Sequence, residues 1–155
     1  MRQYGGLVVA IELAERKRDE AGQALANALR RQDNATQQMA QLESYAADTQ
    51  GRWSVASQAQ ATPQIVGHYY QFMERLDQTI ALQIVVIGDM QRHCQVARQT
   101  LLDAEVHLAG LQRVLDKRRR EQTRISTRQE QRQTDEFAAR VWSVTMARVA
   151  YQDKP

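Results

Sequence analysis

The sequence is poor in the residues that shape turns and sheets. Its 155 residues include 7 glycines and 2 prolines, and aromatic residues make up only 6%. A β-sandwich or barrel needs many turn residues and β-branched runs, and a doubly wound α/β enzyme needs strands that alternate with helices. Neither pattern is present, so the sequence predicts an elongated all-α protein.

Cysteine and long apolar runs are also scarce. The single cysteine, Cys94, cannot form an internal disulfide and fits a reducing compartment. The first apolar stretch, Leu7–Ile11, is followed at once by Glu12, and is shorter than the roughly 7–15 apolar residues of a signal peptide. The run Ile84–Ile87 is far below the ~20 residues that span a bilayer. We therefore expect a cytoplasmic protein.

The sequence shows no arrangement of residues typical of catalysis. Glycine-rich phosphate loops are absent, and no nucleophile is accompanied by a base. His93 adjoins Cys94, but adjacent helical residues point about 100° apart and cannot chelate a metal together. We predict no catalytic residue, cofactor, metal or small-molecule ligand.

Apolar residues in the first part of the chain recur at alternating steps of four and three. Ten of these twelve positions are apolar, the exceptions being Arg18 and Gln32. The positions are Leu7, Ile11, Ala14, Arg18, Ala21, Leu25, Ala28, Gln32, Ala35, Met39, Leu42 and Ala46.

The same stepping is stronger in the second part, where thirteen of fourteen positions are apolar. A seam sustained over this length indicates a coiled coil, with Cys94 as a small core residue. The positions are Tyr69, Met73, Leu76, Ile80, Gln83, Ile87, Met90, Cys94, Ala97, Leu101, Ala104, Leu108, Leu111 and Leu115.

Gly51 and Pro63 interrupt the two periodic segments, and Thr62-Pro63 is typical of a helix start. An antiparallel hairpin would then place Leu7 beside Leu108 and Ala46 beside Tyr69. The prediction is one coiled-coil domain (1–155) with helix 1 at about 4–50, a linker at about 51–63 and helix 2 at about 64–150.

Helix 2 is expected to extend beyond the end of helix 1, because the apolar seam ends after Leu115. The last ~40 residues would then form a charged helical overhang without a partner helix. An apolar patch reappears near its end and suggests a docking surface. The patch consists of Phe137, Val141, Trp142, Val144 and Tyr151.

Positive charge is concentrated in one part of this second segment. The net charge is +3 overall, but Gln112–Arg132 carries eight basic and three acidic residues. The stripe lacks interleaved aromatic residues, so contact with an acidic protein surface is favoured over nucleic acid. Its members recur every three or four residues: Arg113, Lys117, Arg120, Arg124, Arg128 and Arg132.

Four local segments, in this order and spacing, resemble the FliJ family, a coiled-coil component of the bacterial flagellar type III export apparatus. They are LAERKRDEA (Leu13–Ala21), QQMAQLESY (Gln37–Tyr45), HYYQFMERLDQTI (His68–Ile80) and TDEFAAR (Thr134–Arg140).

The resemblance implies a non-catalytic helper of flagellar protein export, and hence of flagellar assembly, motility and chemotaxis. It implies a hairpin similar to the stalk of the rotary ATPase γ subunit. The implied partners are the hexameric export ATPase, the cytoplasmic part of the export-gate membrane protein and free export chaperones. The implied location is the cytoplasm, peripherally at the inner membrane of the flagellar base.

The resemblance also implies a surface that binds the export gate. Tyr45 and Phe72 lie one residue off the seam, so we expect them to form one partly exposed patch. Leu42 and Leu76 lie on the seam, and core packing remains open for both. The implied gate-binding positions are Gln38, Leu42, Tyr45, Phe72 and Leu76, with Thr49, Thr79 and Gln83 standing where the family more often has other side chains.

For the ATPase, we expect the basic segment near the overhang to meet acidic loops of the ring, since screened charge contacts are weakly directional. The alternatives are a nucleic-acid-binding coiled coil and a self-associating structural coiled coil. The predicted ATPase-binding residues are Arg113, Lys117, Arg118, Arg119, Arg120, Arg124 and Arg128.

Overall fold

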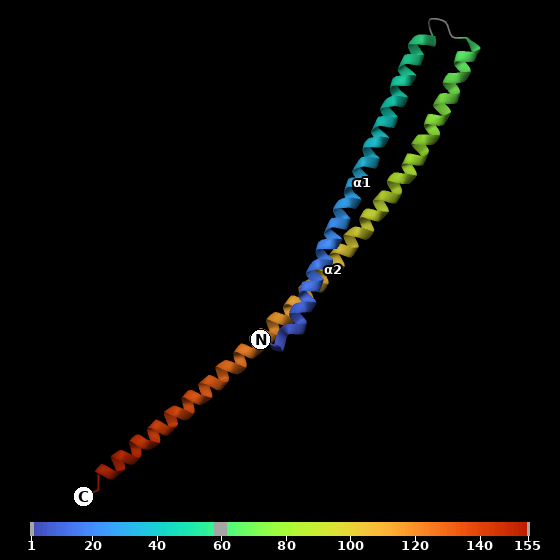
Figure 1. The fold of residues 1–155 in the computed structure, drawn as a ribbon. Helices are drawn as coiled ribbons and strands as arrows, with labels where there is room; N and C mark the ends of the chain where they lie inside the picture. The colour runs from blue at the N-terminus through green and yellow to red at the C-terminus, as the bar shows by residue number, and fades with distance from the viewer. Residues whose placement is uncertain (1, 58–61, 155) are drawn as a thin grey trace. The chain divides into compact units, whose positions relative to one another are not determined.

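Two long helices make up nearly all of the chain. A computed structural model describes residues 2–57 and 62–154. A short 3-10 helix, η1 (Arg2–Tyr4), leads into α1 (Gly5–Ser57), and α2 (Pro63–Gln152) follows (Figure 1). The described residues contain no strand, which confirms the all-α prediction.

The two helices pack along the predicted seam. Every seam position in both lists is buried or half-buried, while most of their neighbours are exposed. The most enclosed side chains are Cys94 at 2% exposed, Ala14 at 3% and Leu108 at 4%. The antiparallel coiled coil and the core position of Cys94 are therefore confirmed. Alanine is the commonest seam residue of α1, at five of twelve positions, so the apolar area buried per residue is small.

Helix α1 is longer than the sequence predicted. Residues 51–57, expected to belong to the linker, are helical. Trp53 stacks on Tyr69 with ring centroids 4.3 Å apart and planes 7° from parallel. A glycine inside a helix costs about 1 kcal/mol, which burial of a large aromatic surface readily offsets, so α1 continues through Gly51. The rest of the predicted linker includes residues 58–61, which lie outside the described residues.

The start of α2 follows the prediction from Thr62-Pro63. The backbone N–H of Ile65 donates to Thr62 Oγ1 at 3.4 Å, and that of Val66 donates to the Thr62 carbonyl at 3.1 Å. Thr62 is thus the N-cap, and Pro63 occupies the first helical position, where its missing N–H leaves no bond unmade.

The alignment of the helices differs from the predicted one. Ala46 was expected beside Tyr69, but Tyr69 stacks on Trp53, seven residues further along α1. The amide of Gln83 reaches across to the carbonyl of Ala35 at 2.9 Å. The alignment differs because α1 continues to Ser57, so the turn between the two helices lies further along the sequence than predicted.

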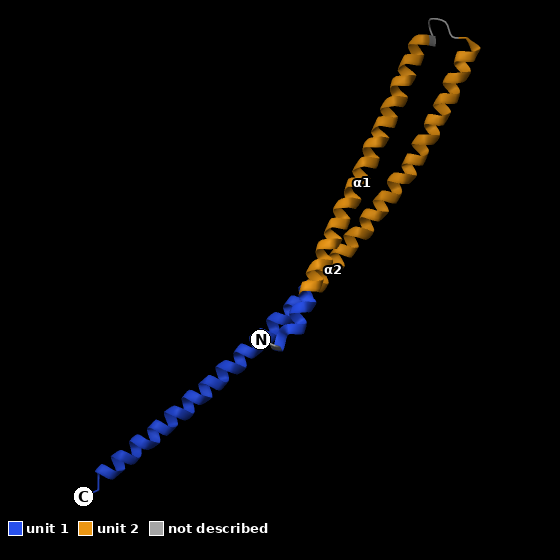
Figure 2. Ribbon diagram, in the orientation of Figure 1, with its two compact units in different colours: residues 1–11, 109–155 blue, residues 12–108 orange. Residues whose placement is uncertain are grey.

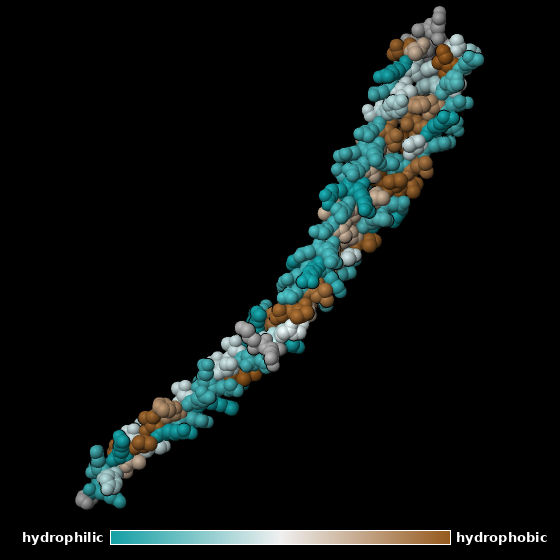
Figure 3. Space-filling model, in the orientation of Figure 1, coloured by the Kyte–Doolittle hydropathy of each residue, from teal (hydrophilic) through white to brown (hydrophobic). Residues whose placement is uncertain are grey.

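The chain divides into two compact units, Glu12–Leu108 and Met1–Ile11 with Ala109–Pro155 (Figure 2). Within the second unit, Tyr4 Oη donates to the Arg118 carbonyl at 3.3 Å, and Leu115 is buried. From Arg119 to Lys154 every described side chain is exposed apart from half-buried Ser126. These residues form the predicted overhang, and apolar side chains surface near its C-terminal end (Figure 3).

Candidate functional site

Two aromatic side chains, one from each helix, form an exposed pair on the hairpin. The rings of Tyr45 and Phe72 meet edge to face, with centroids 5.8 Å apart and planes at 81°. Tyr45 is 55% exposed and Phe72 is 38% exposed. The predicted contact between them is confirmed. Such a pair offers a rigid, partly desolvated anchor of the kind that dominates protein interfaces.

Polar side chains continue this surface along the hairpin. Gln83 Nε2, which binds the Ala35 carbonyl, also lies 3.3 Å from Gln38 Oε1. A shallow groove beside the aromatic pair is lined by Gln38, Gln41, Leu42, Tyr45 and Gln83. We call Gln38, Leu42, Tyr45 and Phe72 the aromatic surface, because these four are accessible in part and lie together.

Of the remaining positions that the family resemblance implies, Leu76 is buried, Thr49 is half-buried and Thr79 is exposed. Leu76 is only 7% exposed and packs in the seam. Thr49 and Thr79 donate their hydroxyls to the carbonyls of Tyr45 and Arg75, one turn earlier in their own helices. The structure therefore brings Leu76 to the core beneath the surface rather than to the surface itself.

Sequence reasoning overlooked an aromatic cluster next to this surface. Tyr69 stacks on Trp53 and also meets Tyr70 edge to face at 5.6 Å. Trp53 continues the four-three stepping beyond Ala46, through Thr49. That step was the available signal, but Gly51 was interpreted as the end of the helix.

The predicted ATPase-binding residues lie on α2 and are all exposed. Four of them line a shallow groove together with Asp116 and Glu121, whereas Arg118 and Arg119 do not contribute to it. None of the seven forms an ion pair with a described residue. The stripe is therefore exposed and free of direct ion pairs among the described residues, and its groove residues are Arg113, Lys117, Arg120 and Arg124.

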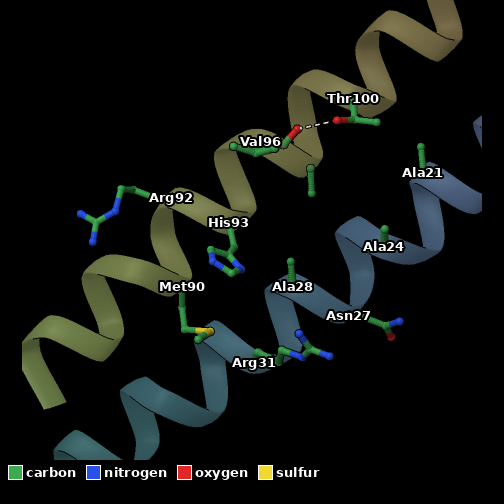
Figure 4. Close-up of a pocket in the computed structure, with 11 residues that line it drawn as sticks. Ala21, Ala24, Asn27, Ala28, Arg31, Met90, Arg92, His93, Val96 and Thr100 are labelled. Atoms are coloured by element: carbon green, nitrogen blue, oxygen red, sulfur yellow. Dashed lines mark hydrogen bonds between the residues drawn. The ribbon is translucent and has the colours of Figure 1, made fainter.

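A larger groove of about 600 Å³ lies further along the hairpin (Figure 4). Ala21, Ala24 and Ala28 of α1 form one wall, and His93 and Val96 of α2 contribute to the other. Most of its lining is apolar, and it contains arginines but no carboxylate. Its short side chains make the wall on α1 shallow.

No group of three or more His, Cys, Asp or Glu side chains that could hold a metal ion occurs among the described residues. In the same part of the chain, no helix is both long and apolar enough for a membrane crossing.

A two-helix hairpin with an exposed aromatic pair and an exposed basic stripe defines a class, the coiled-coil interaction proteins. Comparison with known families makes this more specific. The chain belongs to the flagellar FliJ protein family, whose model matches residues 6–146. No curated protein and no solved structure matches it significantly. Family membership makes the chain a component related to flagellar protein export.

Proposed function

We propose that this chain is a non-catalytic adaptor of flagellar type III export, which uses separate surfaces for the export gate and the export ATPase. The exposed Tyr45–Phe72 pair carries the proposal, because it is an accessible anchor that hairpin stability alone does not require. Family membership supplies the export context.

The aromatic surface is the proposed contact for the cytoplasmic part of the export-gate membrane protein. Tyr45 and Phe72 would supply apolar area, and Gln38 would supply a hydrogen-bonding edge beside them. Leu76 would act from below by holding α2 in place, since its own side chain is buried.

The basic stripe is the proposed contact for the hexameric export ATPase, in the manner of a rotary ATPase stalk. Exposed arginines without ion-pair partners can meet acidic loops at low desolvation cost. The overhang carries a further exposed apolar patch for docking in the ring, formed by Phe137, Val141, Trp142, Val144 and Tyr151.

Binding of free export chaperones and a peripheral position at the inner membrane of the flagellar base complete the proposal. Both rest on the family resemblance. The chain would then work in the cytoplasm, without a cofactor or a small-molecule ligand, and would affect motility and chemotaxis through flagellar assembly.

The test is a pull-down at moderate salt with the cognate export ATPase and the cytoplasmic part of the gate. Tyr45→Ala/Phe72→Ala should weaken gate binding by about 2 kcal/mol or more, roughly 30-fold, and leave ATPase binding intact. The control is Tyr70→Ala, which removes another exposed tyrosine from α2. Equal losses in both variants would contradict the assignment of the aromatic surface.

The ATPase arm compares two double charge reversals of equal net charge. Arg120→Glu/Arg124→Glu changes residues that line the basic groove, and Arg118→Glu/Arg119→Glu changes residues outside it. The first variant should weaken ATPase binding more, with the larger difference at low salt. Unchanged affinity in both would remove the basic stripe from the ATPase contact.

The ATPase-binding experiment also tests the principal alternative, a nucleic-acid-binding coiled coil. Salt-sensitive binding of the wild-type chain to duplex DNA at near-physiological ionic strength, without ATPase binding, would favour a nucleic-acid-binding coiled coil.

A further inference from the structure

The stack of Trp53 on Tyr69 fixes which seam residues of the two helices lie level with each other. Both residues belong to the four-three stepping, so each heptad forward along α2 corresponds to one heptad back along α1. Two heptads from the stack, Gln83 lies level with Met39. The hydrogen bond from Gln83 to the carbonyl of Ala35, one turn before Met39, agrees with this alignment, which we call the first register.

Both glutamines of the seam face a methionine in the first register. Gln32 lies level with Met90, one heptad beyond the level of Gln83 and Met39. All four side chains are half-buried. Gln83 finds acceptors on the neighbouring turn of α1, whereas Gln32 contributes only its backbone carbonyl, and its side-chain amide bonds to no described residue. The first register therefore keeps the two polar side chains of the seam apart.

A slide of one heptad brings these two glutamines level with each other. Gln83 then faces Gln32 in place of Met39, after a displacement of about 10 Å along the helix axis. The apolar seam survives the slide, because each apolar seam residue of α1 from Ala14 to Ala46 again lies level with an apolar residue of α2. A polar residue at a core position selects the register of a coiled coil, and here the polar residues of the two helices match only after the slide.

We propose that the hairpin adopts this second register as a minor conformation, and that exchange between the two registers assembles and separates the aromatic surface. Tyr45 and Phe72 are in contact in the first register. In the second register, Phe72 lies one heptad away from that contact and beside Gln38, so the exposed pair is separated. A ligand that needs both rings binds the first register and shifts the population toward it.

The first register is the major one, because it alone keeps the aromatic contacts near the end of α1. The slide breaks the stack of Trp53 on Tyr69 and removes Gln83 from Ala35. It also shortens the paired part of α1, which then ends near Gly51. Glycine is a weak helix former, so the helix can end there at low cost. The inference does not depend on the proposed function, because the seam of this chain sets both registers.

Cys94 is a native probe of the register, because it is the single cysteine and is buried in the seam. Cys94 lies level with Ala28 in the first register and with Ala21 in the second. A disulfide requires Cα atoms within about 7 Å, so a thiol at either alanine reacts with Cys94 only in the matching register. Ala35 is level with Cys94 in neither register and is the matched control.

The test is oxidation of three full-length variants, Ala28→Cys, Ala21→Cys and Ala35→Cys, by oxidised glutathione at low protein concentration. Mass spectrometry of the monomer measures the intramolecular disulfide as the loss of both free thiols. Ala28→Cys should crosslink fastest, and Ala21→Cys at least about tenfold more slowly, because the second register is the minor one. Ala35→Cys should stay reduced. Crosslinking of Ala21→Cys no faster than that of Ala35→Cys would overturn the proposal.

An added Gln32→Leu substitution makes the test specific to the polar match. It should slow the crosslinking of Ala21→Cys at least about threefold and leave that of Ala28→Cys unchanged, because leucine cannot bond to Gln83. The control is Gln23→Leu, at an exposed position outside the seam. An unchanged rate of Ala21→Cys crosslinking with Gln32→Leu, or equal slowing by the control, would overturn the proposal.

The crosslinked chains connect the register to the aromatic contacts. With Trp142→Phe, Trp53 is the remaining tryptophan and reports on its stack with Tyr69. Oxidation of Ala21→Cys should shift the emission of Trp53 to longer wavelength, because the indole exchanges a stacked ring for water, whereas oxidation of Ala28→Cys should not. Circular dichroism verifies that each variant stays helical. The same emission in both oxidised chains would contradict the separation of the aromatic contacts in the second register.

Discussion

Leu76 and Phe72 lie one turn apart on α2 and have different surroundings. Leu76 is 7% exposed and belongs to the seam, whereas Phe72 is 38% exposed and touches Tyr45 at the surface. The family resemblance implies the same role for both residues. Their packing separates them into a residue that supports the helix and a residue that can contact a partner.

This difference predicts opposite consequences of two alanine substitutions. Leu76→Ala should lower the free energy of unfolding by about 2–5 kcal/mol, because it opens a cavity in the seam. Phe72→Ala should lower it by about 1 kcal/mol, the contribution of one partly exposed aromatic contact. Urea unfolding followed by circular dichroism measures both, and equal losses would contradict the assignment of Leu76 to the core.

At the scale of the helices, periodicity predicted most of the fold. Every predicted seam residue is at least half-buried, because a four-three repeat allows only one face of a helix to meet its partner. The end of α1 and the alignment were wrong, because Gly51 was given more influence than the packing of Trp53 on Tyr69. Helix propensity depends on neighbouring residues in the sequence, whereas the contact of Trp53 depends on Tyr69 of the other helix. Sequence-local reasoning therefore could not predict it.

For the candidate surfaces, the sequence predicted that Tyr45 and Phe72 meet, since both lie one residue off the seam. It could not decide whether Leu42 and Leu76 are accessible, because seam positions range from buried, as Leu76 is, to half-buried, as Leu42 is. The grouping of Arg120 with Arg124 follows helical spacing and was predictable.

Gly51 provides a prediction at the level of α1. A Cβ added at Gly51 would meet no atom within 4 Å, and the glycine lies inside a helix. Gly51→Ala should therefore raise the free energy of unfolding by about 0.5–1 kcal/mol. A thermal melt followed by circular dichroism measures the change, with Gly67→Ala in α2 as a second open site. A lower melting temperature for Gly51→Ala would contradict the helical assignment of residues 51–57.

At the scale of the whole molecule, buried side chains are confined to one part of the sequence. Buried side chains extend from Ile11 to Leu115, whereas described residues from Arg119 onward are almost all exposed. The stability of a helical segment without a packing partner depends on helix propensity and local charge pairs, and both contribute little free energy in water. The overhang is thus available for a partner without loss to the hairpin.

Truncation should reveal this separation. Ending the chain after Arg118 should reduce the helical circular dichroism signal and leave the melting temperature of the hairpin within a few degrees of the full chain. Ending it after Leu108 also removes Leu111 and Leu115 from the seam and should lower the melting temperature further. A large drop in the first truncation would show that the overhang stabilises the hairpin.

Gln83 introduces one polar group into a seam that is otherwise apolar along α2. Repeating heptads allow a hairpin to slide by seven residues and still bury leucine against alanine. In a slipped hairpin, the Gln83 amide would lose the Ala35 carbonyl and the Gln38 side chain, which it binds in this alignment. Gln83 is half-buried, so the loss is about that of one net hydrogen bond, roughly 0.5–1.5 kcal/mol, and the slipped states are depopulated about two- to tenfold. Gln83 thus favours one register of the two helices over the others that a nearly uniform heptad repeat allows.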